Sequence, residues 1–432
     1  MQKVVRIAIT GALSLAAVAP AARALDLPGA LREVAVSNPT LASRRATVES
    51  MRSGAPAAGA WDAPMLELGV SNVPTSGRFD MDPMTMRMVG IEQKVPVFGA
   101  RSLARRAREQ AAAAESSGAA GTALELYADT WTAYADAYWS GALLRDAQAH
   151  LSEMDRVVES ARARYSSGRG RMEELLQAQA ERAAADADVE DFGAESRGAR
   201  ATLDALRGLP PGGAGETLEA PPEPAVPASP APWLAVLDET HPRLAMPASE
   251  ARRYRLEAAS ARRMTWPDLD LRFGYGFRST LADGTSQDDM FSASVGVMLP
   301  LFAAGRDGAM GRQMDAMARS RDEDGRAERL ALERDLTRAH ADAIAASRTA
   351  TLLKDGVLVL RAKALDAAWS AYGAGVSDLG GVLEQSHAYW NDQIRLMRTR
   401  QQLAHAQARA LELAGRGEPF GLVLPPFEEE TR

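Results

Sequence analysis

The chain has 432 residues, which is long for one compact core and enough for two ordinary domains or one elongated architecture. It contains no cysteine, so disulfide bonds, thiolate metal sites and cysteine nucleophiles are excluded. The formal net charge of −7 argues against nucleic acid as a main partner.

Residues 1–24 have the form of a secretory signal peptide. Lys3 and Arg6 give a positive start, residues 4–18 are mostly apolar, and Ala22-Arg23-Ala24 is a small-x-small cleavage site. The apolar run is shorter than the roughly 18 residues that a transmembrane helix needs, and no later apolar run reaches that length. We therefore expect an exported mature chain.

An internal duplication organises the rest of the chain. Matching positions lie 203 to 207 residues apart: Pro39 and Pro242, Pro64 and Pro267, Pro96 and Pro300, and Tyr165 and Tyr372. This predicts one repeat over 25–209, a Pro/Gly-rich irregular linker over 210–232, a second repeat over 233–415, and a mobile tail over 416–432.

Each repeat contains two segments in which apolar and polar residues alternate, as they do in half-buried β-strands. The predicted strands are about 64–73 and 86–95 in the first repeat and about 268–278 and 290–299 in the second. Their length of roughly ten residues suits tilted transmembrane strands, and Trp61 and Trp266 suit a membrane interface. A soluble antiparallel sandwich would also explain the alternation.

Long helices are predicted after each strand pair. There is no proline between Pro96 and Pro210 or between Pro300 and Pro419, and both windows are rich in Ala, Arg, Glu and Leu. The predicted helices are about 101–164, 172–206, 306–371 and 379–413, with apolar residues at 3-4 spacing. The longest would span roughly 100 Å at 1.5 Å per residue.

Strand and helix meet at a motif that occurs twice. It reads Val95-Pro-Val-Phe-Gly-Ala-Arg101 in the first repeat and Leu299-Pro-Leu-Phe-Ala-Ala-Gly-Arg306 in the second. The predicted junction residues from the sheet to the helices are Pro96, Phe98, Gly99, Pro300, Phe302 and Gly305. At the far end, glycines let each helix reverse. The predicted tip residues are Gly168, Arg169, Gly170, Gly375, Val376, Ser377 and Asp378.

Two features could bind ions. Met84, Met86 and Met88 alternate on the side of the predicted strand that carries Gly90, and thioethers suit soft ions such as Cu(I) or Ag(I). They could equally be flexible apolar fillers. Asp378 could form an acidic ring when three copies meet, or it could cap the returning helix.

These helix starts, junctions and tips together resemble the TolC family of outer-membrane efflux proteins. The resemblance implies an α+β membrane protein with four transmembrane strands and long antiparallel coiled-coil helices in each chain. It implies a homotrimer with a 12-stranded β-barrel continuous with a 12-helix periplasmic α-barrel. It also implies a location in the Gram-negative outer membrane, in contact with its lipid and extending into the periplasm. The partners would be a periplasmic adaptor (membrane fusion) protein and an inner-membrane pump of the RND type.

No catalytic or cofactor-binding motif is present, so the expected protein is a passive channel rather than an enzyme. The segments Ser71-Asn-Val-Pro-Thr and Asp82-Pro-Met-Thr-Met resemble the heavy-metal efflux branch, copper/silver or cobalt-zinc-cadmium, which predicts metal ions as cargo. Two alternatives remain. The same fold could serve a multidrug or type I secretion duct, or the chain could be a periplasmic coiled-coil scaffold or adaptor.

Overall fold

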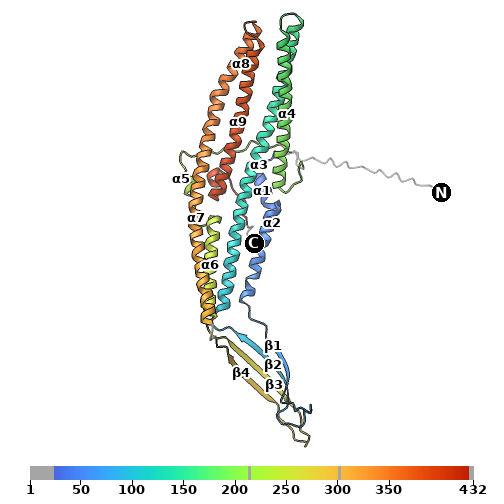
Figure 1. Ribbon diagram of the computed structural model, residues 1–432, viewed down its shortest axis with the longest axis vertical. Helices are drawn as coiled ribbons and strands as arrows, with labels where there is room; N and C mark the ends of the chain where they lie inside the picture. Colours follow the sequence, from blue (N-terminus) through green and yellow to red (C-terminus); the bar gives the residue numbers. More distant parts are fainter. Residues whose placement is uncertain (1–23, 213–215, 300–302, 428–432) are drawn as a thin grey trace, which may run out of the picture.

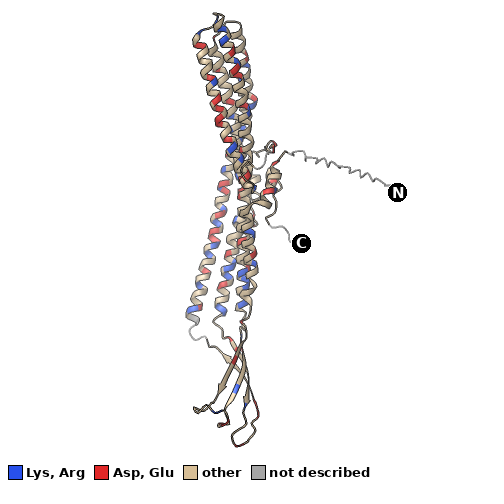
Figure 2. Cartoon of the chain, turned by 90° about the vertical axis from the view of Figure 1, so that its right-hand side faces the viewer, with Lys and Arg blue, Asp and Glu red and all other residues tan. Residues whose placement is uncertain are grey.

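The computed structural model describes residues 24–212, 216–299 and 303–427. They form a long rod in which helices make up most of the length and a small sheet forms one end (Figure 1). Charged side chains are spread along the helical part and also occur in the sheet (Figure 2). No helix within these ranges is both long and apolar enough to cross a membrane.

The two repeats follow the same path. The elements of the first are α1 (Leu27–Ser37), α2 (Pro39–Gly54), the 3-10 turn η1 (Pro56–Gly59), β1 (Met65–Ser71), β2 (Met86–Val95), α3 (Ala100–Ser166) and α4 (Met172–Leu206). The elements of the second are α6 (Pro242–Arg263), β3 (Leu269–Arg278), β4 (Met290–Val297), α7 (Ala303–Leu352), the π-turn η2 (Leu353–Val357), α8 (Leu358–Gly373) and α9 (Leu379–Ala414). The short α5 (Ala231–Leu234) lies between the repeats, and η3 (Glu418–Phe420) follows them.

Equivalent caps begin the helices that lead toward the sheet. The Asn38 side chain accepts a hydrogen bond from the backbone N–H of Thr40 at 2.9 Å, and Pro39 follows at the first helical position. In the second repeat, His241 Nδ1 accepts from the N–H of Arg243 at 3.2 Å, again just before a proline. Both arrangements satisfy an amide that the helix itself leaves unpaired.

The prediction of an unbroken helix over 306–371 was wrong in one detail, because the π-turn η2 interrupts it. The spacing between the repeats grows from 204 residues at Pro96 and Pro300 to 207 at Tyr165 and Tyr372, so the second copy carries inserted residues. A π-turn accommodates one more residue than an α-turn. The π-turn therefore accommodates one inserted residue while the chain stays helical on both sides.

The described part of the predicted linker is largely irregular, as expected, but it is packed, and the described part of the tail is packed as well. Val226 of the linker and Phe420 of the tail pack onto the middle of the rod, where the Phe420 ring contacts Trp131 of α3 and Trp233 of α5. The helices also supply donors to the backbone carbonyls of these segments: Gln407 Nε2 binds Pro224 O at 2.7 Å, and Tyr127 OH binds Pro425 O at 3.2 Å. The two segments thus form a belt around the helices despite their low apolar content.

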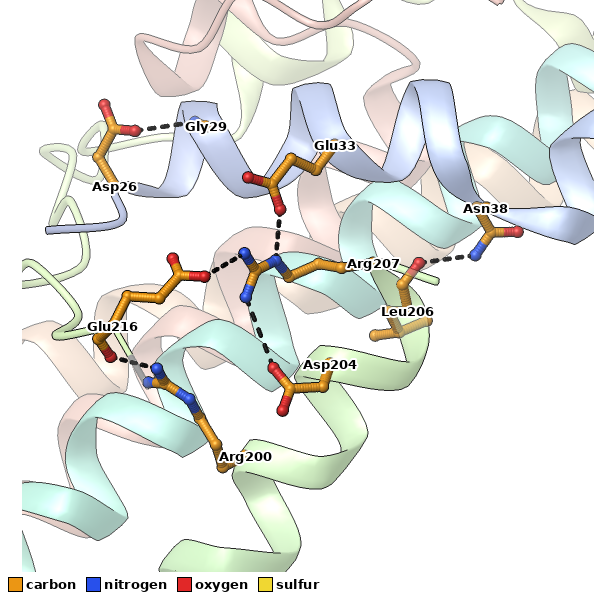
Figure 3. A network of polar contacts seen from close by, with 9 residues as sticks. All are labelled: Asp26, Gly29, Glu33, Asn38, Arg200, Asp204, Leu206, Arg207 and Glu216. Atoms are coloured by element: carbon orange, nitrogen blue, oxygen red, sulfur yellow. Dashed lines mark hydrogen bonds and ion pairs between the residues drawn. The ribbon is translucent and has the colours of Figure 1, made fainter. Parts of the chain in front are cut away.

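A buried arginine joins this belt to the first repeat (Figure 3). Arg207, at the end of α4, is only 2 % exposed and contacts three carboxylates. Their distances are 2.6 Å to Glu33, 2.7 Å to Glu216 and 3.5 Å to Asp204. Burial opposes the charge, but the hydrogen bonds to Glu33 and Glu216 outweigh burial and raise the pKa of Arg207.

We expect Arg207→Met to lower the free energy of unfolding by about 3–5 kcal/mol, because it leaves the fully buried Asp204 without its cation. The loss would be measured by unfolding the purified protein in detergent and following its helical circular dichroism. Arg182→Met is the control, since its pairs with Asp155 and Asp186 are solvent-exposed and should matter little. Equal losses in both variants would contradict a special role for Arg207.

Candidate functional site

The sheet has one apolar and one polar face. Its order is β1-β2-β3-β4 with every neighbouring pair antiparallel, so residues paired across strands share a face. The apolar face is formed by Leu66, Leu68, Val70, Val89, Ile91, Val95, Leu269, Leu271, Phe273, Tyr275, Phe277, Phe291, Ala293, Val295 and Val297. Arg87 and Gln93 are its polar members. Many of the apolar side chains are exposed in the single chain, with Leu68 at 74 % and Phe291 at 70 %.

The opposite face is polar and rich in glycine. It is formed by Met65, Glu67, Gly69, Ser71, Met86, Met88, Gly90, Glu92, Lys94, Asp270, Arg272, Gly274, Gly276, Arg278, Met290, Ser292, Ser294 and Gly296. Across the two repeats, Arg272 Nε lies 3.2 Å from Glu92 Oε2, and Glu92 is buried. Sequence reasoning missed this pair, because the pairing register of β2 and β3 is not visible in either segment alone.

The three candidate methionines do not all lie together. Met86 and Met88 lie on the polar face of β2, as predicted, but Met84 precedes the strand. The backbone N–H of Met84 donates to the Asp82 side chain at 2.7 Å, so a turn holds it instead. The two strand methionines lean over glycines of β3: Met86 Sδ lies 2.8 Å from where a Cβ of Gly276 would stand. They thus occupy room that the glycines leave open.

Backbone geometry explains the first junction. Gly99 has φ of 75°, a left-handed conformation that glycine adopts without strain, and its carbonyl accepts from Ser102 Oγ at 2.8 Å and Leu103 N at 3.2 Å. The Phe98 ring lies 4.9 Å from that of Trp266 in the second repeat. Pro96 follows the last residue of β2 and cannot extend its ladder.

The second junction is described only in part. Pro300 and Phe302 lie outside the described residues. Gly305 lies in the first turn of α7, with open space where a Cβ would stand.

The two tips are built alike. Gly168 and Gly375 have φ of 71° and 72°, which permits the left-handed turn that ends a helix. After the first, Arg169 N and Gly170 N both donate to Arg164 O, at 2.9 and 3.0 Å. After the second, Val376 N and Ser377 N both donate to Ala371 O, at 2.9 and 3.3 Å. Arg169 is exposed, and Val376 is 83 % exposed.

A contact joins the two tips to each other. The Arg164 guanidinium lies 4.4 Å from the centre of the Tyr372 ring, and its Nη1 donates to Tyr372 O at 3.3 Å. Burial of the ring raises the pKa of the Tyr372 hydroxyl. Sequence reasoning did not find this contact, since it joins two hairpins 208 residues apart.

Asp378 begins α9. Its Oδ1 accepts from the N–H of Gly381 at 3.3 Å, which is the geometry of a helix N-cap. The side chain is also exposed, so capping leaves its charge accessible to solvent. Among the residues that the structure describes, no group of three or more His, Asp or Glu side chains is placed to hold a metal ion.

A two-faced sheet continuous with long helices defines an elongated subunit built from two similar repeats. The family model for outer membrane efflux proteins matches residues 30–209 and 233–416, one match in each repeat. The chain belongs to the outer membrane efflux protein family, whose TolC-like members are transport conduits and not enzymes.

Solved structures share this fold over nearly the whole chain. The open-state MtrE outer membrane channel of Neisseria gonorrhoeae is 18% identical with a TM-score of 0.73, covering 90% of this chain and 89% of that one. The outer membrane protein VceC of Vibrio cholerae is 18% identical with a TM-score of 0.70, covering 91% and 96%. CusC, whose structures concern transmembrane channel formation, is 17% identical with a TM-score of 0.72, covering 90% of each chain. No curated protein matches the sequence significantly.

We expect Asp378→Asn to weaken block of channel conductance by a polyvalent cation several-fold, because it removes the charge but keeps a good capping side chain. The measurement is single-channel current in planar bilayers with hexaamminecobalt added on the tip side. Asp366→Asn, lower on α8, removes the same charge away from the tip. An unchanged block in Asp378→Asn would exclude a ring of these carboxylates.

Proposed function

We propose that three copies of this chain form an outer-membrane channel that passively conducts substrate from the periplasm, or from a pump, to the exterior. The channel would belong to a tripartite efflux system, with a periplasmic adaptor protein docked at the tips and an inner-membrane pump of the RND type. The sheet carries the proposal, because its two faces and its two open edges make sense only in an assembly.

The apolar face suits lipid and the polar face suits a water-filled lumen. In lipid, however, the free backbone groups along the outer edges of β1 and β4 would be unsatisfied. Four strands cannot close on themselves, so the edges must pair with those of other copies. With four strands per chain, β1 of one copy meets β4 of the next in antiparallel orientation, and three copies give the predicted twelve strands.

The helices point to the same assembly. Three helices lie side by side: α3 contacts α6, and α6 contacts α7. Along α7 and α8, Leu330, Leu352 and Leu360 are each 67 to 69 % exposed, so the described residues leave them largely uncovered. A neighbouring copy would bury them, which accounts for apolar residues on a periplasmic surface.

Heavy-metal ions are the proposed cargo. Met86 and Met88 support this proposal because they place two thioethers on the lumenal face of one strand. The alternative role, as fillers over Gly274 and Gly276, fits their contacts equally well. A multidrug or type I secretion duct remains the alternative cargo class, and a periplasmic scaffold is the alternative of another class.

Neighbouring residues of β4 give a test of the membrane assembly. Val295 lies on the apolar face and Ser294 on the polar face, and both are exposed in the single chain. Val295→Arg should destabilise the inserted trimer by about 2–4 kcal/mol per chain, whereas Ser294→Arg should be tolerated and alter conductance. The readouts are the heat resistance of the trimer on gels and its recovery in the outer-membrane fraction.

A scaffold would give a different result. Both variants would then stay in the soluble fraction without detergent, and neither arginine would be selectively harmful. That outcome would reject the channel.

The cargo hypothesis has its own test. The triple variant Met84→Leu, Met86→Leu and Met88→Leu should lose Ag(I) binding in a calorimetric titration, because leucine keeps the bulk but not the sulfur. Replacing the exposed Met310 and Met317 of α7 by leucine controls for nonspecific thioether binding. Equal binding by the wild type and the triple variant would refute the ligand role and favour the filler role.

A further inference from the structure

Arginines gather on the helix ends next to the sheet (Figure 2). Several have an acidic partner close by: Arg101 pairs with Asp62, Arg105 with Glu109, Arg262 with Asp315, and Arg306 with Asp307. Arg106 of α3 and Arg312 of α7 are exposed and have no ion pair with another described residue, and the same holds for Arg108 and Arg263. Arg106 and Arg312 lie 206 residues apart. The matching residues before them, Pro96 and Pro300, are 204 apart, and those after them, Tyr165 and Tyr372, are 207 apart. Arg106 and Arg312 therefore occupy similar positions in the two repeats.

Both arginines lie on the outer face of the helical layer. Arg312 precedes His340 by four heptads, so the two side chains lie within about 80° of each other around a straight helix. The His340 ring meets the linker, with Nε2 2.7 Å from Pro227 O. Arg106 lies on the 3-4 stripe that includes Tyr127 and Trp131, which α1 and the tail cover. The linker and the tail would block a conducting duct if they lay inside it, so they must lie outside. The two arginines are on the same side of their helices as these segments and therefore face outward.

Both side chains also lean toward the membrane. Side chains on a helix tilt toward its N-terminus, and α3 and α7 both begin at the sheet. The contact of Arg312 agrees with this tilt: its Nη1 lies 3.7 Å from the Cβ position of Gly308, one turn nearer the sheet.

Their height suits a lipid headgroup layer. At 1.5 Å per residue, Arg106 and Arg312 lie about 9 and 14 Å from the starts of their helices, and the side chains reach back from there. Trp61 and Trp266 are 61 % and 53 % exposed at the same end of the rod, and tryptophan favours the membrane interface.

We propose that Arg106 and Arg312 bind the headgroups of anionic phospholipids in the leaflet on the helical side of the sheet. This rests on the proposed function, since it requires the sheet to lie in a membrane. Three copies would present six such arginines around the channel. They would enrich anionic lipid around the channel and fix the depth at which it sits.

The proposal is tested with the full chain in phosphatidylcholine vesicles. Brominated phosphatidylglycerol or brominated phosphatidylcholine is added, and quenching of tryptophan fluorescence gives the relative affinity of the two lipids. We expect the wild type to prefer the anionic lipid, roughly fivefold at each arginine, which corresponds to about 1 kcal/mol per basic residue at an anionic surface. Added salt should reduce the preference.

The variant that carries Arg106→Gln and Arg312→Gln should lose this preference but keep its conductance. The matched control carries Arg169→Gln and Arg171→Gln, which remove the same charge at the opposite tip and should leave the preference unchanged. If the wild type shows no preference, or the double variant keeps it, the arginines do not bind anionic lipid. If neither brominated lipid quenches, the chain is not in the membrane and the proposed channel fails with it.

Discussion

The open edges of a four-stranded sheet are the constraint on which the rest of this structure depends. Outside water, every free N–H and C=O along β1 and β4 carries a cost of several kcal/mol, which no side chain of this sheet can offset. The chain therefore cannot be complete as a single copy in lipid. Leucines on α7 and α8 are also exposed in the single chain, as the proposed assembly would require. Sheet and helices thus require the same neighbours.

Much of this fold could be read from periodicity alone. Alternation assigned the two faces of β3 correctly, since Leu271 and Phe273 share one face and Arg272 lies on the other. The long proline-free windows indicated the long helices, and matched prolines revealed the duplication. These features repeat over many residues, so a single exception such as Gln93 on the apolar face does not hide them.

What the sequence could not reveal depends on single contacts between distant segments. Nothing near Arg207 in the sequence shows that Glu33 and Glu216 converge on it, and nothing near Tyr372 shows that Arg164 stacks on its ring. The packing of the linker was missed for the same reason, because its carbonyls accept hydrogen bonds from helical side chains such as Gln407. Met84 was misplaced because alternation continued in sequence past the residue where pairing begins.

The two repeats have the same order of helices and strands, but the residues exposed at their tips differ. The first tip carries Arg169 and no acidic residue, whereas the second carries Asp378 and the exposed Val376. The stacking of Arg164 on Tyr372 holds the two unlike tips together within one chain. Moving one hairpin alone would break this contact and expose a buried tyrosine ring. Moving the pair of hairpins as a unit preserves it.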